Sequence, residues 1–297
     1  MTCMICGSNQ GLNREENIKE QLSIKYCLDC GTAWADPQPD DATLDAIYGR
    51  HYYDSWALLT HSDITAQLKK LTFRRRLEKC AQWLPFGSRI LDLGCATGFF
   101  LEEAQKHGFS PFGVDCCSYA IDECKQSFDT GRLYCGEFND SSFGLNPDGK
   151  FEAIFMSDYM EHVRDPKLIL SIARDRLVNG GAVVITTPNI ESPTRFLMRR
   201  HWPHFKLEHL WYFSPKGLTG LLTSEGFQVV DVWPITKHLS LAYILAQLAQ
   251  YSGQLGSSMI RLTQKVLPKC LLELSLSLRT GEFTIVAIRS DSNDDKS

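Results

Sequence analysis

The segment 90–100, with the sequence ILDLGCATGFF, constrains the fold of this chain more than any other stretch. Apolar residues that favour a buried strand lead into a turn that contains Gly94 and Gly98, and the apolar residues that follow are spaced as in a helix. This pattern predicts the first strand, turn and helix of an open α/β sheet. Ligands bind such sheets beyond the carboxyl ends of the strands, where glycine lets the backbone approach a ligand closely.

The spacing of the glycines and one acidic residue indicate which ligand binds there. A dinucleotide site has the pattern G-x-G-x-x-G and places pyrophosphate on the helix N-terminus. Here the pattern is Asp92-x-Gly94-x-x-x-Gly98, with Ala96 at the central position. The charge of Asp92 would repel pyrophosphate but suits a ligand with an ammonium or sulfonium group. The segment resembles motif I of the class I S-adenosylmethionine (SAM) dependent methyltransferases, although a strand, glycine turn and helix alone also fit other doubly wound proteins.

A second acidic residue follows at the distance that this interpretation requires. The short apolar segment 111–115, PFGVD, ends in Asp115, 17 residues after Gly98. A carboxylate that binds a ribose commonly lies about 20 residues after the glycine turn. The resemblance therefore implies that Asp115 binds the ribose hydroxyls of the adenosine group.

Two further motifs follow later strands of the predicted sheet. The strand expected over 151–156 leads into EHV at 161–163, and the strand expected over 182–187 leads into TPN at 187–189. The glycine pair at 180–181 predicts the end of the preceding helix. An acid-His-Val motif after the fourth strand resembles the ubiquinone-type O-methyltransferases and many small-molecule and sugar methyltransferases.

The resemblance covers residues 85–235 and implies an α/β fold. The expected fold is a Rossmann-like, seven-stranded class I methyltransferase sheet, with an antiparallel seventh strand (281–288) beside the sixth (226–232). By position in this fold, the expected SAM-binding residues are Tyr53, Asp92, Gly94, Cys95, Ala96, Gly98, Asp115, Cys116, Glu137, Phe138, Met156 and Ser157.

Four cysteines near the N-terminus have the spacing of a metal site. Cys3-x-x-Cys6 and Cys27-x-x-Cys30 are separated by 20 residues, which is typical of a tetrahedral four-cysteine zinc ribbon. A redox dithiol or two disulfides are the alternatives. A module of about 35 residues cannot bury a sufficient core, so metal binding would supply much of its folding energy. The other cysteines are interpreted as small buried apolar residues, two of them (Cys95 and Cys116) lining the SAM pocket: Cys80, Cys95, Cys116, Cys117, Cys124, Cys135 and Cys270.

The remaining patterns divide the chain into parts. Helices are expected from Thr43 and over 66–83, and Ser214 predicts the N-cap of a helix over 215–224. The insertion 237–280 has two apolar faces at helical spacing, which would close over the substrate, form a homodimer surface or make weak membrane contact. The expected division is a zinc ribbon over 1–35, a helical lid or linker over 36–84, a methyltransferase domain over 85–290 with the helical insertion before its last strand, and a disordered tail over 291–297.

Methyl transfer needs a base when the acceptor is a neutral hydroxyl or must lose a C–H proton. The candidates are His162, Glu208 and His209. The sequence EHLWYFS from Glu208 onward is similar to the His-Glu-His-x-x-Tyr-Phe-Ser stretch of zinc-headed deoxysugar C-methyltransferases, which implies acid/base roles for Glu208 and His209. Lys206 and Leu207 replace the Tyr and the first His of that stretch, which favours a hydroxyl over a carbon acceptor. Both histidines also fit a purely structural role as packed residues bonded to the backbone.

Composition bears on the partners of the chain. The 297 residues carry a net charge of −4, which argues against nucleic acid as the main partner. The basic clusters at 74–76 and 199–201 are interpreted as solvated helix faces. The first residues show no signal-peptide pattern, no apolar run is long enough to span a membrane, and eleven cysteines indicate a reducing compartment, so a cytoplasmic location is expected.

The sequence therefore predicts a SAM- and zinc-binding methyltransferase that acts on a small-molecule or sugar-type hydroxyl. The alternatives are an RNA-base methyltransferase, a deoxysugar C-methyltransferase and an adaptor without activity that binds protein through its zinc ribbon. The acidic balance disfavours RNA, and the intact motif I disfavours the adaptor.

Overall fold

A seven-stranded sheet forms the centre of the molecule in a computed structural model, which describes residues 2–9, 12–19, 22–47, 63–138, 149–251 and 254–290. In spatial order its strands are β10 (Phe227–Pro234), β13 (Glu282–Arg289), β8 (Leu177–Pro188), β7 (Phe151–Ser157), β4 (Arg89–Leu93), β5 (Ser110–Asp115) and β6 (Leu133–Cys135). Strand β13 runs antiparallel to both of its neighbours, and the other neighbouring strands are parallel. The predicted fold, with an antiparallel last strand beside the sixth, is confirmed.

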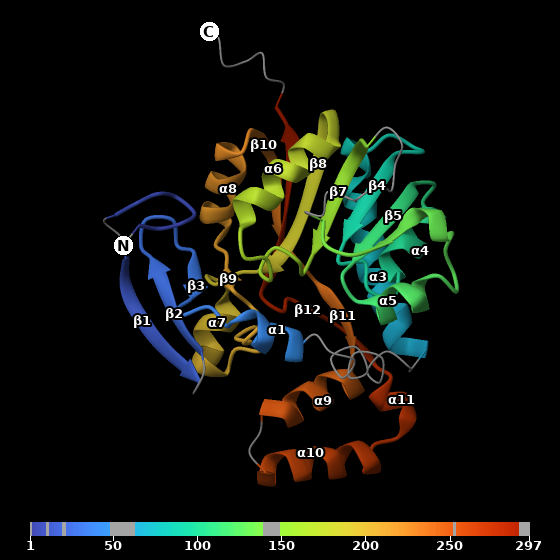
Figure 1. The fold of residues 1–297 in the computed structure, drawn as a ribbon. Helices are drawn as coiled ribbons and strands as arrows, with labels where there is room; N and C mark the ends of the chain where they lie inside the picture. Colours follow the sequence, from blue (N-terminus) through green and yellow to red (C-terminus); the bar gives the residue numbers. More distant parts are fainter. Residues whose placement is uncertain are drawn as a thin grey trace.

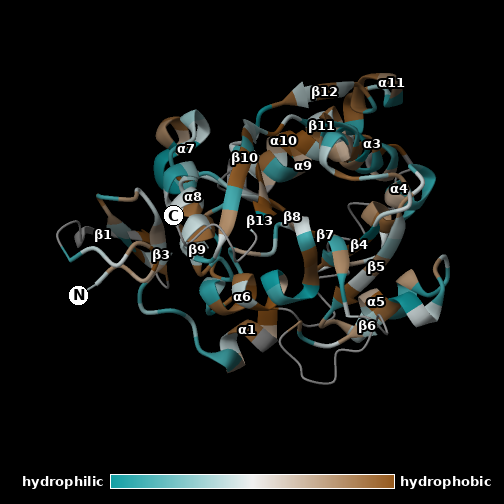
Figure 2. Ribbon diagram, turned by 90° about the horizontal axis from the view of Figure 1, so that it is seen from above, coloured by the Kyte–Doolittle hydropathy of each residue, from teal (hydrophilic) through white to brown (hydrophobic). Residues whose placement is uncertain are grey.

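Helices cover both faces of this sheet (Figure 1). One face packs against α3 (Asp63–Cys80), α4 (Phe99–Lys106) and α5 (Ser118–Cys124), and the other packs against α6 (Pro166–Arg176) and α8 (Pro215–Ser224). Figure 2 shows the sheet from above, with α6 on one side and α3 and α4 on the other. The buried apolar residues form one cluster on each face, so the sheet is fixed from both sides.

Two local predictions have different outcomes. The helix over 215–224 is confirmed: Ser214 accepts a hydrogen bond from Gly217 N–H and Pro215 occupies the first turn. The prediction that the glycine pair at 180–181 ends a helix is wrong. Helix α6 ends at Arg176, and both glycines lie within β8, at a register shift in its pairing with β7, where the positive φ of Gly180 suits an irregular strand.

The N-terminal residues form a second sheet. Its antiparallel strands are β1 (Leu12–Lys19), β2 (Leu22–Cys27), β3 (Ala33–Ala35) and β9 (Trp211–Tyr212). The last of these comes from the segment between β8 and α8, so the N-terminal sheet is completed by a strand from the larger part of the chain. Helix α1 (Asp41–Ile47) follows β3 and begins two residues before the expected Thr43.

The insertion before the last strand consists of two long helices and a pair of short strands. Helices α9 (Leu241–Tyr251) and α10 (Gln254–Val266) pack together, α11 (Lys269–Leu272) follows, and β11 (Lys237–Ser240) pairs with β12 (Ser275–Leu278). The predicted helices are confirmed, whereas the strand pair was not predicted. Met259, Leu262 and Val266 of α10 are exposed. Within the described residues, none of the helices has the length and apolar character needed to cross a membrane.

Candidate functional site

A cavity of about 1480 Å³ lies at the carboxyl ends of β4, β5 and β7. Its lining comes from the turns after these strands, from α3, from residues 203–209 and from the insertion. This is the position at which open α/β sheets bind ligands. The cavity therefore brings most of the predicted cofactor residues together with two of the predicted acid/base residues, His162 and His209.

The turn after β4 has the backbone shape that its glycines predict. Gly98 has a φ of +85°, and a Cβ atom there would lie 2.6 Å from the Cys124 sulfur, so both the conformation and the space require glycine. Asp92 is buried at the end of β4, and burial raises the pKa of its carboxyl group well above its ordinary value, while Arg76 opposes this shift. One carboxylate oxygen of Asp92, Oδ1, has no hydrogen-bond partner among the described residues.

Asp115 connects the two turns that form this side of the cavity. The backbone N–H of Ala96 donates to its Oδ2 atom and the N–H of Cys117 donates to its Oδ1 atom, both at 2.9 Å. The carboxylate is 5% exposed and lines the cavity. Its charge is thus fixed next to the glycine turn, in a position that suits the ribose of an adenosine group.

Most of the other expected cofactor residues also line the cavity. They are Gly94, Cys95, Ala96, Cys116, Glu137, Phe138 and Ser157. Gly98 and Met156 do not line it: Gly98 caps the start of α4 and Met156 is fully buried in the core. Tyr53 lies outside the described residues.

The interpretation of the remaining cysteines as buried is only partly correct. Cys80, Cys95 and Cys124 are buried, whereas Cys116, Cys135 and Cys270 are exposed. The exposed ones lie in the turn after β5, at the end of β6 and in α11, where a small apolar side chain has no core to join. The sequence around these cysteines has no periodic pattern that would have separated the buried ones from the exposed ones.

Two histidines and a glutamate meet in another part of the cavity lining. Glu161, His162 and His209 each offer one ligand atom, and these three atoms lie within 4.8 Å of one another. The imidazole rings are perpendicular, with centroids 4.7 Å apart. Desolvation in the cavity wall lowers the pKa of His162 to about 4 and that of His209 well below 6.5, so both imidazoles are neutral at physiological pH.

The environment of this cluster indicates what it can do. Thr187 donates to one oxygen of Glu161 at 3.0 Å, and the other oxygen, Oε1, has no hydrogen-bond partner among the described residues. The same holds for Nδ1 of His209. Burial raises the pKa of the Glu161 carboxyl group well above its ordinary value. The cluster can therefore accept a proton from a hydroxyl group, or it can bind a divalent metal ion through two imidazoles and one carboxylate.

Glu208 lies differently from its neighbour His209. Its carboxylate is 3.8 Å from the Lys206 ammonium, and its carbonyl oxygen is 3.1 Å from Nδ1 of His162. Residues 206 and 209 line the cavity, whereas Glu208 does not. Glu208 thus contacts the cluster through its backbone rather than through its acid group.

Several charged residues of the cavity were not expected from the sequence. Arg76 was interpreted as part of a solvated helix face, but it is 5% exposed and donates to Ser157 Oγ at 2.5 Å. Lys237 pairs with Glu282 and lies 3.9 Å from Asp158. Desolvation lowers the pKa of Lys69 to about 7. Arg76 and Lys69 lie seven residues apart on α3, so helical spacing was the one signal that could have placed them together.

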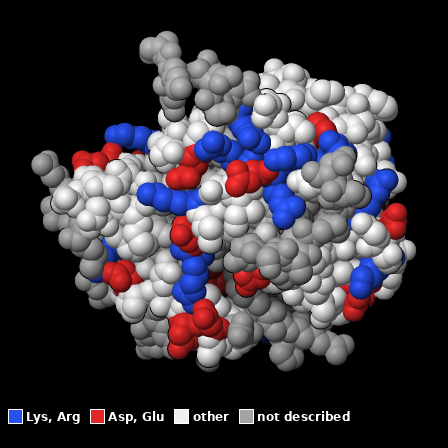
Figure 3. All heavy atoms as spheres, turned by 45° about the horizontal axis from the view of Figure 1, so that its top comes forward, with Lys and Arg blue, Asp and Glu red and all other residues white. Residues whose placement is uncertain are grey.

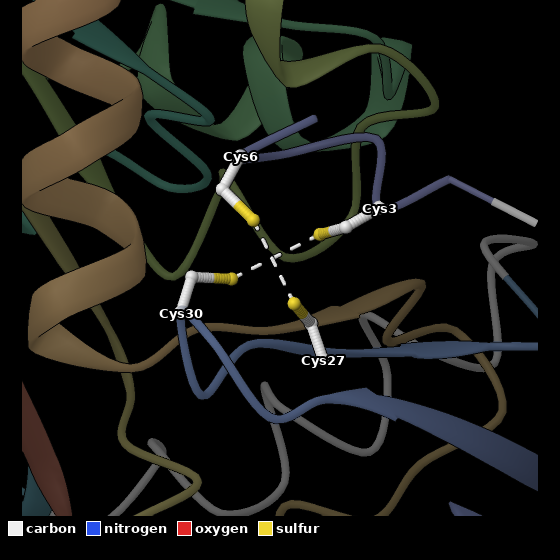
Figure 4. Close-up of side chains that lie close together, drawn as sticks. All are labelled: Cys3, Cys6, Cys27 and Cys30. Atoms are coloured by element: carbon white, nitrogen blue, oxygen red, sulfur yellow. Dashed lines mark hydrogen bonds between the residues drawn. The ribbon is translucent and has the colours of Figure 1, made fainter. Parts of the chain in front are cut away.

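The four N-terminal cysteines meet in one cluster (Figure 4). The sulfur atoms of Cys3 and Cys30 are 3.9 Å apart, and those of Cys6 and Cys27 are 3.6 Å apart. A tetrahedral zinc ion with Zn–S bonds of about 2.3 Å requires S···S distances of about 3.8 Å. A hydrogen bond from the Cys30 thiol lowers the pKa of Cys3 to about 5, which favours a thiolate. The donor set and its dimensions fit zinc.

Comparison with known proteins assigns the family. The sequence model of the methyltransferase domain family matches residues 65–232. This chain belongs to that family. The strand order of the sheet and the motifs at 92–98 and 115 agree with the match, so the chain is a class I SAM-dependent methyltransferase, as the sequence predicts.

Two curated relatives carry the name ubiquinone biosynthesis O-methyltransferase. The protein from Cereibacter sphaeroides is 28% identical over 187 residues, which cover 55% of this chain and 74% of that protein. The protein from Dinoroseobacter shibae is 28% identical over 157 residues, which cover 50% of this chain and 63% of that protein. About half of this chain therefore lies outside the region of similarity to these relatives.

Solved structures share the fold of this methyltransferase. A putative methyltransferase from Bacillus halodurans has a TM-score of 0.52 at 13% identity, with 73% of this chain and 99% of that chain covered. A SAM-dependent methyltransferase from Clostridium acetobutylicum has a TM-score of 0.51 at 16% identity, with 80% of this chain and 99% of that chain covered. These likenesses concern the fold alone.

Charges on the face seen in Figure 3 are mixed. Among the described residues, lysine and arginine side chains lie beside aspartate and glutamate side chains over this face and do not form a patch of one sign. Binding of nucleic acid depends on positive charge gathered along a surface. The described residues of this face therefore do not form the continuous positive surface that would bind a phosphate backbone.

Proposed function

We propose that this methyltransferase transfers a methyl group from SAM to a hydroxyl group of a small-molecule or sugar-type acceptor. The observation that carries the proposal is that the Glu161–His162–His209 cluster lines the same cavity as Asp92 and Asp115. The names of the curated relatives support an oxygen acceptor. When bound, SAM supplies an activated methyl group on sulfur.

The residues of this chain then have separate tasks. Asp115 and the turn around Gly94 would hold the cofactor, and the polar groups after β7 and before β9 would orient the acceptor. In such a transfer much of the rate comes from holding the reacting atoms about 3 Å apart in a dry pocket. His209 would take the hydroxyl proton, because its imidazole is neutral and its Nδ1 atom is without a partner among the described residues.

One observation favours a second way to activate the acceptor. The ligand atoms of Glu161, His162 and His209 are close enough to bind one divalent metal ion together. A hydroxyl group bound to such an ion loses its proton more readily, so the metal would replace the imidazole as the activating group. If dialysis abolishes activity and addition of Mg²⁺ or Mn²⁺ restores it, the result would support activation by a metal ion. Activity that is unaffected by dialysis and by added ions would support His209 as the base.

We further propose that Cys3, Cys6, Cys27 and Cys30 hold one zinc ion and that residues 1–35 form a zinc ribbon ahead of the methyltransferase domain. The sulfur distances support this proposal. A redox dithiol remains the alternative that zinc analysis would decide. None of the eleven cysteines forms a disulfide, which agrees with the proposed location in the cytoplasm.

The test of the proposed function is incubation with methyl-labelled SAM and cell extract, followed by separation into small molecules, lipids, RNA and protein. We expect the label in a small-molecule or lipid-soluble fraction. Label confined to RNA would instead support an RNA-base methyltransferase. Absence of both label transfer and SAM binding by the folded protein would leave the protein-binding adaptor as the better account.

A further inference from the structure

We propose that the four-cysteine module positions His209 in the part of the cavity that would bind the acceptor, called the acceptor wall below. Residues 208–214, called the histidine segment below, carry His209 and are held by the module through strand β3 and through the turn at Cys30. The inference rests on the proposed function, because it assigns zinc to the cysteines and a role in turnover to His209. The inference adds that loss of zinc would lower the rate of methyl transfer and leave the affinity for SAM unchanged.

The first link is a short strand pair. Trp34 of β3 pairs with Trp211 of β9, and Ala33 pairs with Tyr212. The N–H of Ala35 donates to the carbonyl oxygen of Leu210 at 2.9 Å. Strand β9 of the histidine segment therefore forms the edge of the N-terminal sheet, and the bonding to β3 begins at Leu210, the residue after His209.

The same segment is bonded on its other side to the loop after β7. The N–H groups of Leu210 and Trp211 donate to the carbonyl oxygen of Glu161, at 2.8 Å and 3.2 Å. The indole of Trp211 donates to the carbonyl oxygen of Val163 at 2.8 Å. Because Leu210 is bonded on both sides, a displacement of β3 changes the position of His209 relative to Glu161 and His162.

The second link joins the metal turn to helix α8. Ser214 Oγ donates to the carbonyl oxygen of Cys30 and accepts from the N–H of Gly217. A Cβ atom at Gly217 would lie 2.0 Å from Thr32 Oγ1, so the module and the helix are in direct contact there. Lys216 donates to the carbonyl oxygen of Asp29. The turn that carries two of the cysteines is thus fixed to the end of the histidine segment.

The apolar core continues across this contact. Cys3, Cys27, Cys30 and Trp34 belong to the same buried cluster as Trp211. The rings of Trp34 and Trp211 have centroids 6.5 Å apart. A module of this size cannot bury a core alone, and here it completes its core with the histidine segment. Loss of zinc would therefore loosen the packing next to His209.

The cofactor side of the cavity shares the apolar core with the module but is held by hydrogen bonds of its own. Asp115 is held by the amides of Ala96 and Cys117, and the N–H groups of Gly94 and Cys95 in the turn after β4 donate to the carbonyl oxygen of Val114 in β5. Within the described residues, the hydrogen bonds of the module that are given above do not reach these turns. A change in the module should therefore alter kcat far more than the Kd of SAM.

The test compares two serine substitutions. Ser214→Ala removes the hydroxyl that joins α8 to Cys30, and Ser88→Ala removes a buried hydroxyl before β4 that donates to the carbonyl oxygen of Pro85 and does not line the cavity. Both lose a buried hydrogen bond from a serine hydroxyl to a backbone carbonyl, so both should destabilise the protein. We expect Ser214→Ala to lower kcat at least about tenfold, because a small misplacement of a reacting group has such an effect. The Kd of SAM should stay within about twofold, and Ser88→Ala should change neither quantity.

Hydrogen–deuterium exchange gives a readout that does not depend on catalysis. In protein without SAM, exchange of the amides of Leu210 and Trp211 should be faster in Ser214→Ala and in zinc-free Cys27→Ser than in the wild type or Ser88→Ala. Unchanged exchange in both variants would overturn the inference, as would an unchanged kcat in Ser214→Ala. If no methyl transfer is found at all, the proposed function fails, and the exchange result still decides whether the module positions this segment.

Discussion

Asp115 is the residue whose chemistry follows most directly from its surroundings. Two backbone amides fix its carboxylate beside the glycine turn, and one face of it remains open to the cavity. A carboxylate held in this way can accept hydrogen bonds from a ribose without reorganisation, which is why a single substitution should have a measurable effect on SAM binding.

Asp115→Ala should weaken SAM binding by about 1.5–3 kcal/mol, the usual contribution of a charged hydrogen bond. Calorimetric titration of the wild type and the variant measures this difference. Asp129→Ala is the matched control, because Asp129 also accepts a backbone N–H but does not line the cavity. Equal affinities for the wild type and Asp115→Ala would show that the cofactor lies elsewhere.

His209→Ala should lower turnover by about 10²- to 10⁴-fold, whether His209 takes the proton or binds a metal ion. SAM affinity should be nearly unchanged, because Asp115 and the glycine turn bind the cofactor. Steady-state kinetics together with calorimetry separate the two effects. A matched substitution is His107→Ala, in which the histidine lies at the end of α4 outside the cavity. Full activity of His209→Ala would remove this residue from the mechanism.

Elements differ in how far the sequence predicts them. The strand and turn at 89–98 and the helix at 215–224 could be predicted, because apolar spacing, glycines and the Ser214 cap are local signals. Strand β9 has two residues and exists through pairing with β3, far away in the chain, so no local signal indicates it. The β11–β12 pair is non-local for the same reason, and it is what brings Lys237 to the cavity.

The first strand of the insertion also makes a testable electrostatic contact. Burial alone would raise the pKa of Glu282, but Lys237 of β11 lowers it to about 2 from an ordinary value of 4.5. The pair therefore stabilises the folded state fully above about pH 4.5, and this contribution is lost as the pH falls towards 2. Lys237→Met should reduce the free energy of unfolding at pH 7 by about 1–3 kcal/mol, because it leaves the buried Glu282 carboxylate without this donor, and it should reduce the loss of stability between these pH values.

Urea denaturation at pH 7 and pH 3 measures this effect. The matched control is Lys125→Met, because Lys125 pairs with Asp122 on the exposed surface at 2.8 Å. An exposed pair of this kind contributes less than about 1 kcal/mol. If both variants lose the same stability at pH 7, the buried position of Glu282 has no special importance.

At the scale of the whole molecule, the N-terminal module and the sheet form one connected structure. The module contributes three strands and the larger part of the chain contributes the fourth. The cysteine spacing predicted the metal cluster because knuckle geometry is local, but it could not show that the cluster lies against the acceptor wall. That relation depends on packing between distant segments.

Elemental analysis should find one zinc ion per chain in protein purified without chelator, since four sulfur atoms lie at the distances that a tetrahedral ion requires. Cys27→Ser should lose it, whereas Cys270→Ser, which alters an exposed cysteine of α11, should retain it. Less than about a tenth of an equivalent in the wild type would favour a redox role for the cysteines.

The central claim is that SAM bound in this cavity methylates an oxygen atom. The most direct measurement is a carbon NMR spectrum of the reaction products formed from ¹³C-methyl SAM and cell extract, recorded for wild type and for Asp115→Ala. We predict a new resonance in the methoxy region, in a small-molecule or lipid-soluble product, that is strongly reduced in the variant. A label that appears only in N-methyl or C-methyl resonances, or only in RNA, would contradict the account.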